Sequence, residues 1–302
     1  MPDRPRQSLE VRRHGSELGS WEMATRRPHP ALAGQVLRIA GYVERTRVPL
    51  SRLEAPFSGI VVILSFDEQL RLVDAEGRDP VHTSFTAGLS DGPTFTEHAG
   101  SQHGIQVDLS PPAARALLGV PLRELTSRVV ALEDVIGPAV PVLLERLYEQ
   151  PSWDRRFDLV ERELARRLAE APPVPSPIAG AWRRLCDTRG RAEIGELARD
   201  LGYSRRRLSG RFNEELGLPP KAFARVLRFE RVTERLMRDH GSRFAEIAQD
   251  CGYYDQAHMN RDFREFAGVS PSQYVGRLLP DGGGVAGSND VPFVQDEAAA
   301  AA

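Results

Sequence analysis

A run near the C-terminus constrains the fold more than any other stretch of the chain. Residues 244–274 read FAEIAQDCGYYDQAHMNRDFREFAGVSPSQY, a pattern that predicts two short helices joined by a tight turn. Apolar residues follow helical spacing from Phe244 to Cys251, and Gly252 can adopt the left-handed backbone that ends a helix. The sequence therefore predicts a helix-turn-helix unit here.

The second helix of this unit has signals at both ends. Asp255 is a good N-cap, and Gly268 ends the helix. Pro271 begins a further turn, which places Tyr274 back against the two helices. The apolar stripe that faces inward consists of Met259, Phe263 and Phe266.

A second copy of the pattern lies upstream, at residues 194–223, IGELARDLGYSRRRLSGRFNEELGLPPKAF. The offset between the copies is 50 residues up to Tyr203 and Tyr253, and 51 residues from Ser204 and Asp255 onward. One residue is therefore inserted in the second turn, and the region is a tandem repeat. The later matching pairs are Leu208 with Met259, Phe212 with Phe263, Gly217 with Gly268, Pro220 with Pro271 and Phe223 with Tyr274.

The segment that joins the copies predicts one long helix. Residues 221–239, KAFARVLRFERVTERLMRD, have no Gly or Pro and correspond to about five helical turns. A rigid spacer of this kind can hold two recognition helices roughly 34 Å apart, which is one turn of DNA. The two helices could then enter successive major-groove segments without a dimer.

Residues 178–279 resemble the DNA-binding domain of the AraC/XylS family of bacterial transcriptional regulators. The most specific part of the resemblance is GYYDQAHMNRDFREFAGVSPSQY, residues 252–274. The resemblance implies sequence-specific binding to double-stranded DNA, and contact with RNA polymerase if the protein is an activator. It also implies an N-terminal sensing or dimerising domain, often a β-barrel of cupin type.

The distribution of charge agrees with this resemblance. The whole chain has a net charge of −2, but residues 178–279 contain 19 Lys and Arg against 14 Asp and Glu, a surplus of +5. The remainder of the chain is therefore near −7. The basic residues lie where DNA is expected to bind.

Outward-facing residues of the two recognition helices are the expected DNA contacts. In the second helix we expect Gln256 and Arg261 to contact bases, Ala257 to touch only a thymine methyl, and His258 to contact a phosphate or remain a surface histidine. In the first, Arg206 could read guanine with a bidentate pair. The phosphate contacts expected there are Arg205, Arg207 and Arg211. The full predicted set is Ser204, Arg205, Arg206, Arg207, Ser209, Arg211, Asp255, Gln256, Ala257, His258 and Arg261.

Gly210 is the departure from this pattern. It offers no side chain at a position where a reading residue is expected, and it weakens the helix by roughly 1 kcal/mol relative to Ala. Specificity is therefore expected to depend more on the second unit.

The rest of the chain predicts an α+β protein of two domains. Residues 31–170 form the expected sensing or dimerisation domain, in which strand-like runs such as 36–46 and 57–66 predict a small antiparallel cupin-like barrel or sandwich. Its apolar run Val61 to Leu64 more often fills a core than lines a ligand pocket, so a small-molecule effector is left open. The other expected segments are a disordered start at 1–30, helices at 111–119, 122–130, 138–149 and 153–170, a Pro-rich linker at 171–177 and a disordered tail at 280–302.

The helix expected at 153–170 has an apolar seam with steps of four and three residues. Such a seam could pair with a second copy of the chain to form a homodimer. It could equally pack on its own β-domain, because a seam of little more than two heptads is short for a coiled coil. The sequence leaves both interpretations open.

The main rival is a small-molecule-binding or metal-dependent cupin-like enzyme with an accessory helical domain. His29, His82, His98 and His103 lie in the β-region, but no two have tight ligand spacing, and no P-loop, G-x-S-x-G or H-E-x-x-H is present. We therefore expect no catalytic activity, no metal and no cofactor. A third interpretation is a protein-interaction module that kept the helices and lost DNA affinity, because of Gly210.

Composition narrows the compartment. The chain is 41% hydrophobic and 27% charged, and no apolar run approaches the roughly 20 residues that a membrane helix needs. Cys186 and Cys251 are too few and too far apart for a disulfide framework. The sequence predicts a cytoplasmic protein without membrane contact.

Arg206→Ala tests the predicted guanine contact. The variant should weaken binding selectively at one base pair, because a bidentate arginine distinguishes bases by about 1–3 kcal/mol. Binding to specific and random DNA, measured by fluorescence anisotropy, checks this; an equal loss on both would show a phosphate contact only.

Overall fold

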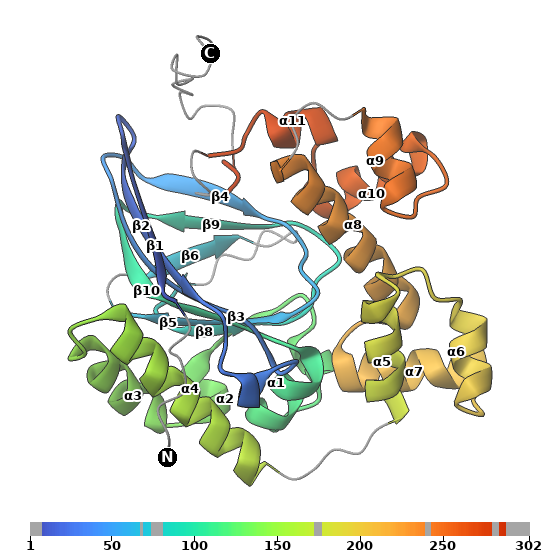
Figure 1. Ribbon diagram of the computed structural model, residues 1–302, viewed down its shortest axis with the longest axis horizontal. Coiled ribbons are helices and arrows are strands. Elements are labelled where there is room, and N and C mark those ends of the chain that lie inside the picture. Colours follow the sequence, from blue (N-terminus) through green and yellow to red (C-terminus); the bar gives the residue numbers. More distant parts are fainter. Residues whose placement is uncertain are drawn as a thin grey trace.

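The structure is a computed structural model that describes residues 8–66, 69–73, 81–171, 177–238, 243–279 and 284–287. A β-rich N-terminal domain with helices on one side precedes a helical C-terminal domain (Figure 1). This confirms the predicted α+β fold class. The domain boundaries at 31, 170 and 178 remain predictions.

The strands of the described residues form two antiparallel sheets. The larger sheet contains, in spatial order, β1 (Glu10–Ser16), β2 (Gly19–Arg26), β3 (Val36–Thr46), β10 (Ser101–Leu109), β5 (Ile60–Ser65), β8 (Phe85–Ala87) and β11 (Val129–Ala131). The smaller sheet contains β4 (Leu50–Glu54), β9 (Thr94–His98), β6 (Leu70–Val73) and β7 (Val81–His82). The strands expected at 36–46 and 57–66 are therefore present.

Strand β10 shows how the larger sheet divides its two faces. Ile105, Val107 and Leu109 are almost fully buried within the main apolar cluster. The alternate residues Gln106 and Asp108 point to the opposite face, toward the smaller sheet. Because side chains alternate along a strand, one face of the sheet is apolar and the other is partly polar.

Helices cover the apolar face of the larger sheet (Figure 1). The helices are η1 (Pro30–Leu32), α1 (Pro111–Leu118), η2 (Leu122–Leu125), α2 (Leu132–Ile136), α3 (Ala139–Tyr148) and α4 (Trp153–Glu170). Gly119, in the left-handed region at φ 70°, ends α1, as the sequence predicts. The helix predicted at 122–130 is wrong beyond Leu125, because residues 129–131 pair with β8 as an edge strand.

The prediction of disorder across residues 1–30 is wrong for the described part of that segment. Strands β1 and β2 form a hairpin, and β2 pairs with β3 along its whole length. The Trp153 indole donates a hydrogen bond of 2.7 Å to Glu22 on β2. The pairing with β3 and the contact with Trp153 hold this segment in place, and its own low periodicity does not reveal them.

The apolar seam of α4 packs within its own chain. Trp153, Phe157, Val160 and Leu164 are each at most 8% exposed. A Cβ on Gly41 of β3 would overlap the Trp153 ring, so helix and sheet are in close contact there. The seam therefore packs on the β-domain and is not open to a second copy.

A buried polar cluster centred on Glu44 links the two sheets. Glu44 of β3 accepts hydrogen bonds from Trp21 Nε1, at 2.7 Å, and from Arg52 Nη2 of β4, at 2.6 and 2.7 Å to its two oxygens. His98 Nε2 of β9 lies 3.5 Å from Glu44 Oε1. Burial alone would raise the pKa of Glu44, but His98 and Arg52 outweigh it, so the pKa lies below its ordinary value.

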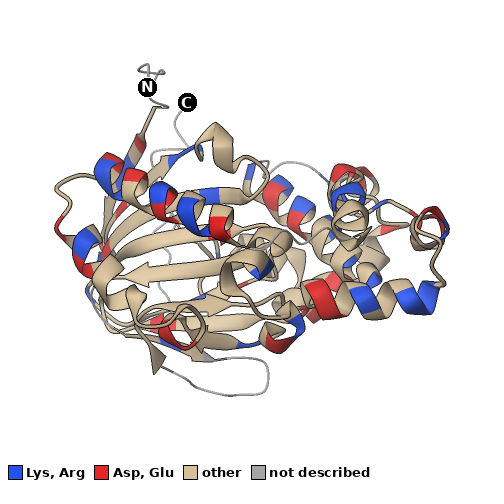
Figure 2. Cartoon of the chain, turned by 90° about the horizontal axis from the view of Figure 1, so that it is seen from below, with Lys and Arg blue, Asp and Glu red and all other residues tan. Residues whose placement is uncertain are grey.

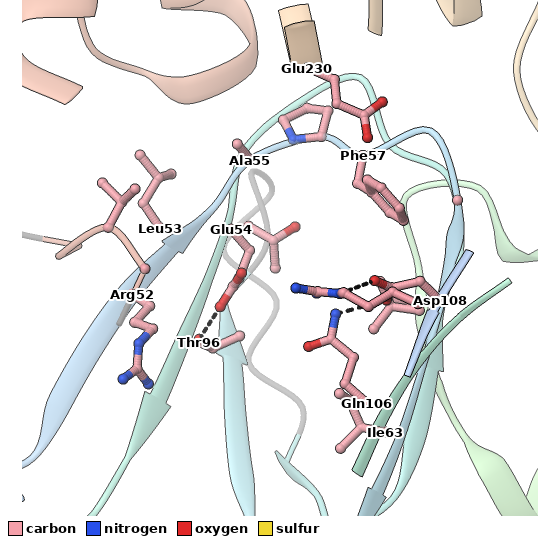
Figure 3. Close-up of a pocket in the computed structure, with 18 of the residues that line it drawn as sticks. Arg52, Leu53, Glu54, Ala55, Phe57, Ile63, Thr96, Gln106, Asp108 and Glu230 are labelled. Atoms are coloured by element: carbon pink, nitrogen blue, oxygen red, sulfur yellow. Dashed lines mark hydrogen bonds and ion pairs between the residues drawn. The ribbon is translucent and has the colours of Figure 1, made fainter. Parts of the chain in front are cut away.

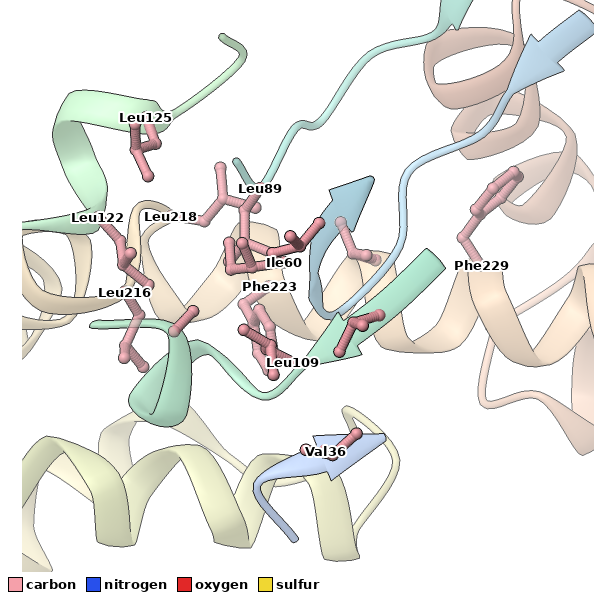
Figure 4. Packing of buried hydrophobic residues seen from close by; sticks show 14 of the residues in the cluster. Val36, Ile60, Leu89, Leu109, Leu122, Leu125, Leu216, Leu218, Phe223 and Phe229 are labelled. Carbon is pink, nitrogen blue, oxygen red and sulfur yellow. The ribbon is translucent and has the colours of Figure 1, made fainter. Parts of the chain in front are cut away.

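The C-terminal domain shares one apolar cluster with the N-terminal domain. Its helices are α5 (Pro177–Asp187), α6 (Ile194–Asp200), α7 (Arg205–Leu216), α8 (Pro220–Arg238), α9 (Phe244–Asp250), α10 (Gln256–Ala267) and α11 (Pro271–Val275). Figure 4 shows Leu122 and Leu125 of η2 close to Leu216 and Leu218 of the helical domain. The domains are therefore packed together.

Two predicted segments lie mainly outside the described residues. Residues 172–176 of the expected linker and most of the expected disordered tail are among them. The described tail residues 284–287 contradict disorder there, since Val285 O accepts from Leu53 N at 2.8 Å and Ala286 bridges to Arg52. No helix of the described residues is long and apolar enough to span a bilayer.

Glu44→Ala should lower the free energy of unfolding by about 3–5 kcal/mol, because it removes the buried carboxylate that Trp21, Arg52 and His98 share. The control is Glu97→Ala, which breaks the exposed pair between Glu97 and Arg71 on the smaller sheet and should lower the free energy of unfolding by at most about 1 kcal/mol. Urea denaturation of both variants measures the difference, and similar losses would contradict this role for Glu44.

Candidate nucleic-acid interface and interdomain cavity

Helices α6 and α7 form one helix-turn-helix unit, and α9 and α10 form the other. Ser204 caps α7 by accepting from Arg207 N at 3.2 Å, and Asp255 caps α10 by accepting from His258 N at 2.7 Å. Gly217 and Gly268 end these helices in the left-handed region. The predicted caps and ends of both recognition helices are confirmed.

The turns of the two units have the same internal packing. The Arg207 guanidinium lies 4.4 Å from the centre of the Tyr203 ring, and the His258 ring meets Tyr253 edge-on at 5.2 Å. Arg207 and His258 are matching positions of the repeat. Each stabilises its own turn, so each has an intramolecular role besides any contact with phosphate.

Helix α8 holds the two units as the predicted long helix. Phe229 of α8 packs against Phe263 and Phe266 of α10, with ring centres 4.9 and 5.2 Å apart. Arg225 of α8 pairs with the buried Asp262 at 2.8 Å and with Glu265 at 2.5 Å. Hydrogen bonding from Arg225 lowers the pKa of Glu265. Both apolar and ionic contacts thus fix α10 against the spacer.

The predicted DNA contacts fall into two groups in the structure. Within the described part of the chain, the side chains of Arg206, Gln256 and Arg261 are exposed and make no hydrogen bond or ion pair. Most of the other predicted residues already make contacts within the chain: Ser204 and Asp255 cap helices, Arg207 and His258 pack on tyrosines, and Arg211 pairs with Glu215 at 2.7 Å. The Arg205 side chain lies against Gly195. The two residues with short side chains are Ser209, which is half-buried, and Ala257, which is exposed. The first group has its polar atoms available for DNA.

Gly210 occupies an open position on α7. It is exposed, and a Cβ built there would meet nothing within 4 Å. Its counterpart in the second unit is Arg261. The first unit therefore lacks one exposed cationic side chain, although its backbone leaves room for it.

The C-terminal end of α7 is joined to the N-terminal domain by polar contacts that the sequence did not suggest. The carboxylate of Glu215 is buried and pairs with both Arg211 and Arg115 of α1, the latter at 2.9 Å. Thr126 Oγ1, after η2, donates to the Gly217 carbonyl at 2.6 Å. The first recognition helix is thus held directly by the β-domain. Figure 2 shows basic and acidic residues interspersed along several of the helices.

A cavity of about 1300 Å³ lies between the two sheets and extends to α5, α8 and α11. Figure 3 shows Glu54, Asp108 and Glu230 projecting into it from β4, β10 and α8. Asp108 accepts from Arg38 Nε at 2.7 Å and from Gln106 Nε2 at 2.8 Å. Sequence reasoning missed this site, although the alternation of HGIQVDLS at 103–110 puts Gln106 and Asp108 on the face opposite Ile105 and Val107. In the apolar run of β5, Val61 and Ile63 line the cavity, whereas Val62 and Leu64 lie in the core.

The four histidines considered as metal ligands, His29, His82, His98 and His103, have separate surroundings. His29 Nδ1 accepts from Ala31 N, and His82 lies 6.1 Å from the Phe85 ring, where burial lowers the pKa of His82. His98 adjoins Glu44, and His103 packs between Phe66 and Trp153. In the described ranges, no three His, Cys, Asp or Glu side chains are grouped as metal ligands.

Comparison with known proteins identifies the class of the C-terminal domain. A helix-turn-helix domain family matches residues 197–277. The HTH-type transcriptional regulator Rv1931c of Mycobacterium tuberculosis (strain ATCC 25618 / H37Rv) is 36% identical over 90 residues, or 28% of this chain. The matched region is 34% of that relative, so the chain spans about a third of its length.

Solved structures of related shape cover more of the chain. An apo variant of ToxT from Vibrio cholerae strain SCE256 is 12% identical over 84% of this chain and 100% of that one, with a TM-score of 0.47. Unsaturated fatty acid-bound wild-type ToxT from the same strain is 13% identical over 84% of this chain and 98% of that one, with a TM-score of 0.48. Residues 197–277 match the helix-turn-helix domain family, which confirms the helix-turn-helix part of the resemblance.

Gly210→Arg should strengthen binding to DNA and steepen its salt dependence by roughly one phosphate contact, because the position is open and exposed. The matched control is Gly210→Ala, which should stabilise α7 by about 1 kcal/mol without adding charge. Titrations of DNA at several salt concentrations measure the slope. If both variants have the same slope, position 210 does not face DNA.

Proposed function

We propose that this chain is a sequence-specific DNA-binding transcription regulator of the AraC/XylS type. Its helices α7 and α10 enter successive major-groove segments of one DNA duplex. The observation that supports this most directly is the outward exposure of polar and basic residues on both helices, which the single helix α8 connects. Such a regulator acts on DNA in the cytoplasm.

The two recognition helices contact DNA in different ways in this proposal. In α10, Gln256 and Arg261 read base edges, and their side chains need not break an internal contact to do so. In α7, Arg206 reads guanine, whereas Arg205, Arg207 and Arg211 neutralise phosphates. Ser204, Ser209, Asp255, Ala257 and His258 complete the proposed contact surface.

A small molecule in the N-terminal cavity modulates DNA binding in this proposal. Support comes from the position of the cavity, which is lined by residues of the DNA-binding domain such as Trp182, Glu230 and Tyr274. A ligand there contacts both domains, so its binding free energy can depend on their arrangement. If the protein activates transcription, it also contacts RNA polymerase. A homodimer through α4 would have to use its outer, polar face, because the apolar seam is buried.

DNA binding by the full chain tests the function. Binding to genomic fragments should be salt-dependent and selective, and Gln256→Ala should lower the affinity for the selected site far more than for random DNA. Arg211→Ala should weaken both by a similar factor, because a phosphate contact is independent of sequence. Mobility-shift titrations on the selected site and on random DNA measure both ratios.

Each result has a definite meaning. If the chain does not bind DNA at low salt, the protein is not a DNA-binding regulator. If Gln256→Ala lowers both affinities equally, Gln256 is not a base-reading residue.

A further inference from the structure

The cavity between the sheets has walls of two kinds. Apolar side chains that include Val61, Ile63, Leu72 and Phe85 line the region between the sheets. Where the cavity meets the DNA-binding domain, the lining becomes acidic and aromatic, with Glu54, Glu230, Phe57, Trp182 and Tyr274. A volume of about 1300 Å³ is sufficient for a drug-sized organic molecule.

The arginines that line the cavity are already engaged. Arg38 pairs with Asp108 at 2.7 Å, Arg52 with Glu44 and Arg13 with Glu22 at 2.7 Å. Arg12 pairs with Glu10, and the exposed Arg128 donates to the Glu124 carbonyl. An anionic ligand would have to displace a carboxylate from Arg12, Arg13, Arg38 or Arg52, or else bind at the exposed Arg128.

The carboxylates at the domain boundary have weaker partners. Glu54 accepts from Thr96 Oγ1 at 2.9 Å. Burial, followed by the negative charge of Glu54, raises the pKa of the Tyr274 phenol to about 12. Glu230 of α8 is hydrogen-bonded by Ser58, and no arginine is paired with it in the described residues. Glu54 acts on Tyr274, and Figure 3 shows Glu230 near Phe57. Carboxylates and aromatic rings that line one cavity attract an organic cation through ion pairing and through the faces of the rings.

The surroundings of Glu230 make it sensitive to a positive charge. The groups facing it are Glu234 on its own helix, Asp108 of β10 with its partner Arg38, Ser58 and the Cys186 thiol of α5. Burial, followed by the repulsion of Glu234 and Asp108, raises the pKa of Glu230 to about 7. A bound cation would favour the ionised carboxylate, so cation binding would release a proton near neutral pH.

The geometry points to an apolar organic cation as the ligand of this cavity, with its hydrophobic body between the sheets and its charge against Glu54 and Glu230 at the domain boundary. This inference rests on the proposed function, because it assigns the chemical class of the modulating small molecule. The ligand would touch α8, the helix that connects the two DNA-reading units.

Two pairs of probes isolate the sign of the ligand charge. Tetraphenylphosphonium and tetraphenylborate have nearly the same size and shape, and dodecylammonium and dodecanoate have the same chain length. Isothermal titration calorimetry with the full chain should give at least tenfold tighter binding of each cation than of its matched anion at pH 8. The inference is overturned if the anions bind as tightly as the cations, or if no cation binds.

Variants locate the charge within the cavity. Glu230→Gln and Glu54→Gln should each weaken cation binding by at least tenfold at pH 8 and leave anion binding unchanged. The matched control is Glu97→Gln, because Glu97 adjoins Thr96 on β9 but pairs with Arg71 outside the cavity. An equal effect of Glu97→Gln would show general surface attraction and would overturn the assignment.

The pH dependence provides a readout that an altered fold would not reproduce. Cation affinity of the unaltered chain should rise from pH 6 to pH 8, as Glu230 ionises, whereas Glu230→Gln should show a flatter profile. Equal pH dependence in both proteins would exclude Glu230 as the cation partner. DNA binding is measured on the same samples without a probe. This measurement tests the proposed DNA-binding function separately from cation binding, since either can fail while the other holds.

Discussion

The alternation of side chains across the larger sheet determines how the rest of the molecule is arranged. One face of β10 presents Ile105, Val107 and Leu109, which must be covered by apolar surface, and the helices of the N-terminal domain cover it. The other face presents Gln106 and Asp108, which cannot be buried in an apolar core without polar partners. The smaller sheet therefore covers a cavity beside a small apolar cluster of Ile63, Leu72 and Phe85, and Glu44 links the two sheets through polar contacts.

The same apolar cluster continues into the DNA-binding domain, so the two domains pack directly against each other. Leu122 and Leu125 of the first domain and Leu216 and Leu218 of the second belong to one cluster. Polar contacts at Glu215 and Gly217 also fix the C-terminal end of α7 against the N-terminal domain. A conformational change in the N-terminal domain can therefore alter the position of the first recognition helix through these direct contacts.

Local signals in the sequence were sufficient for the helical domain but not for the junctions. Caps such as Ser204 and Asp255, and glycines such as Gly217, act within one turn of their own helix, so the pattern reveals them directly. The edge strand at 129–131 and the buried pair of Arg115 with Glu215 depend on partners far along the chain, and the hairpin at residues 10–26 is held by β3 and by Trp153. The cavity was missed for a related reason: alternation shows that Gln106 lies on a polar face, but not whether that face meets solvent or a second sheet.

The two helix-turn-helix units differ in what holds them. In the second unit, Arg225 and Phe229 of α8 fix α10 through Asp262, Glu265 and a cluster of aromatic rings. In the first, α7 is held at one end by Arg115, and Arg211 shares the Glu215 carboxylate with it. Arg211 shares its counter-ion with Arg115 of the N-terminal domain, so its electrostatic environment depends on that domain, whereas Arg261 has no such link in the described residues. The first unit therefore has a direct ionic link to the N-terminal domain, whereas the second is linked to the cavity through Tyr274, whose ring lies edge-on to Phe263 of α10.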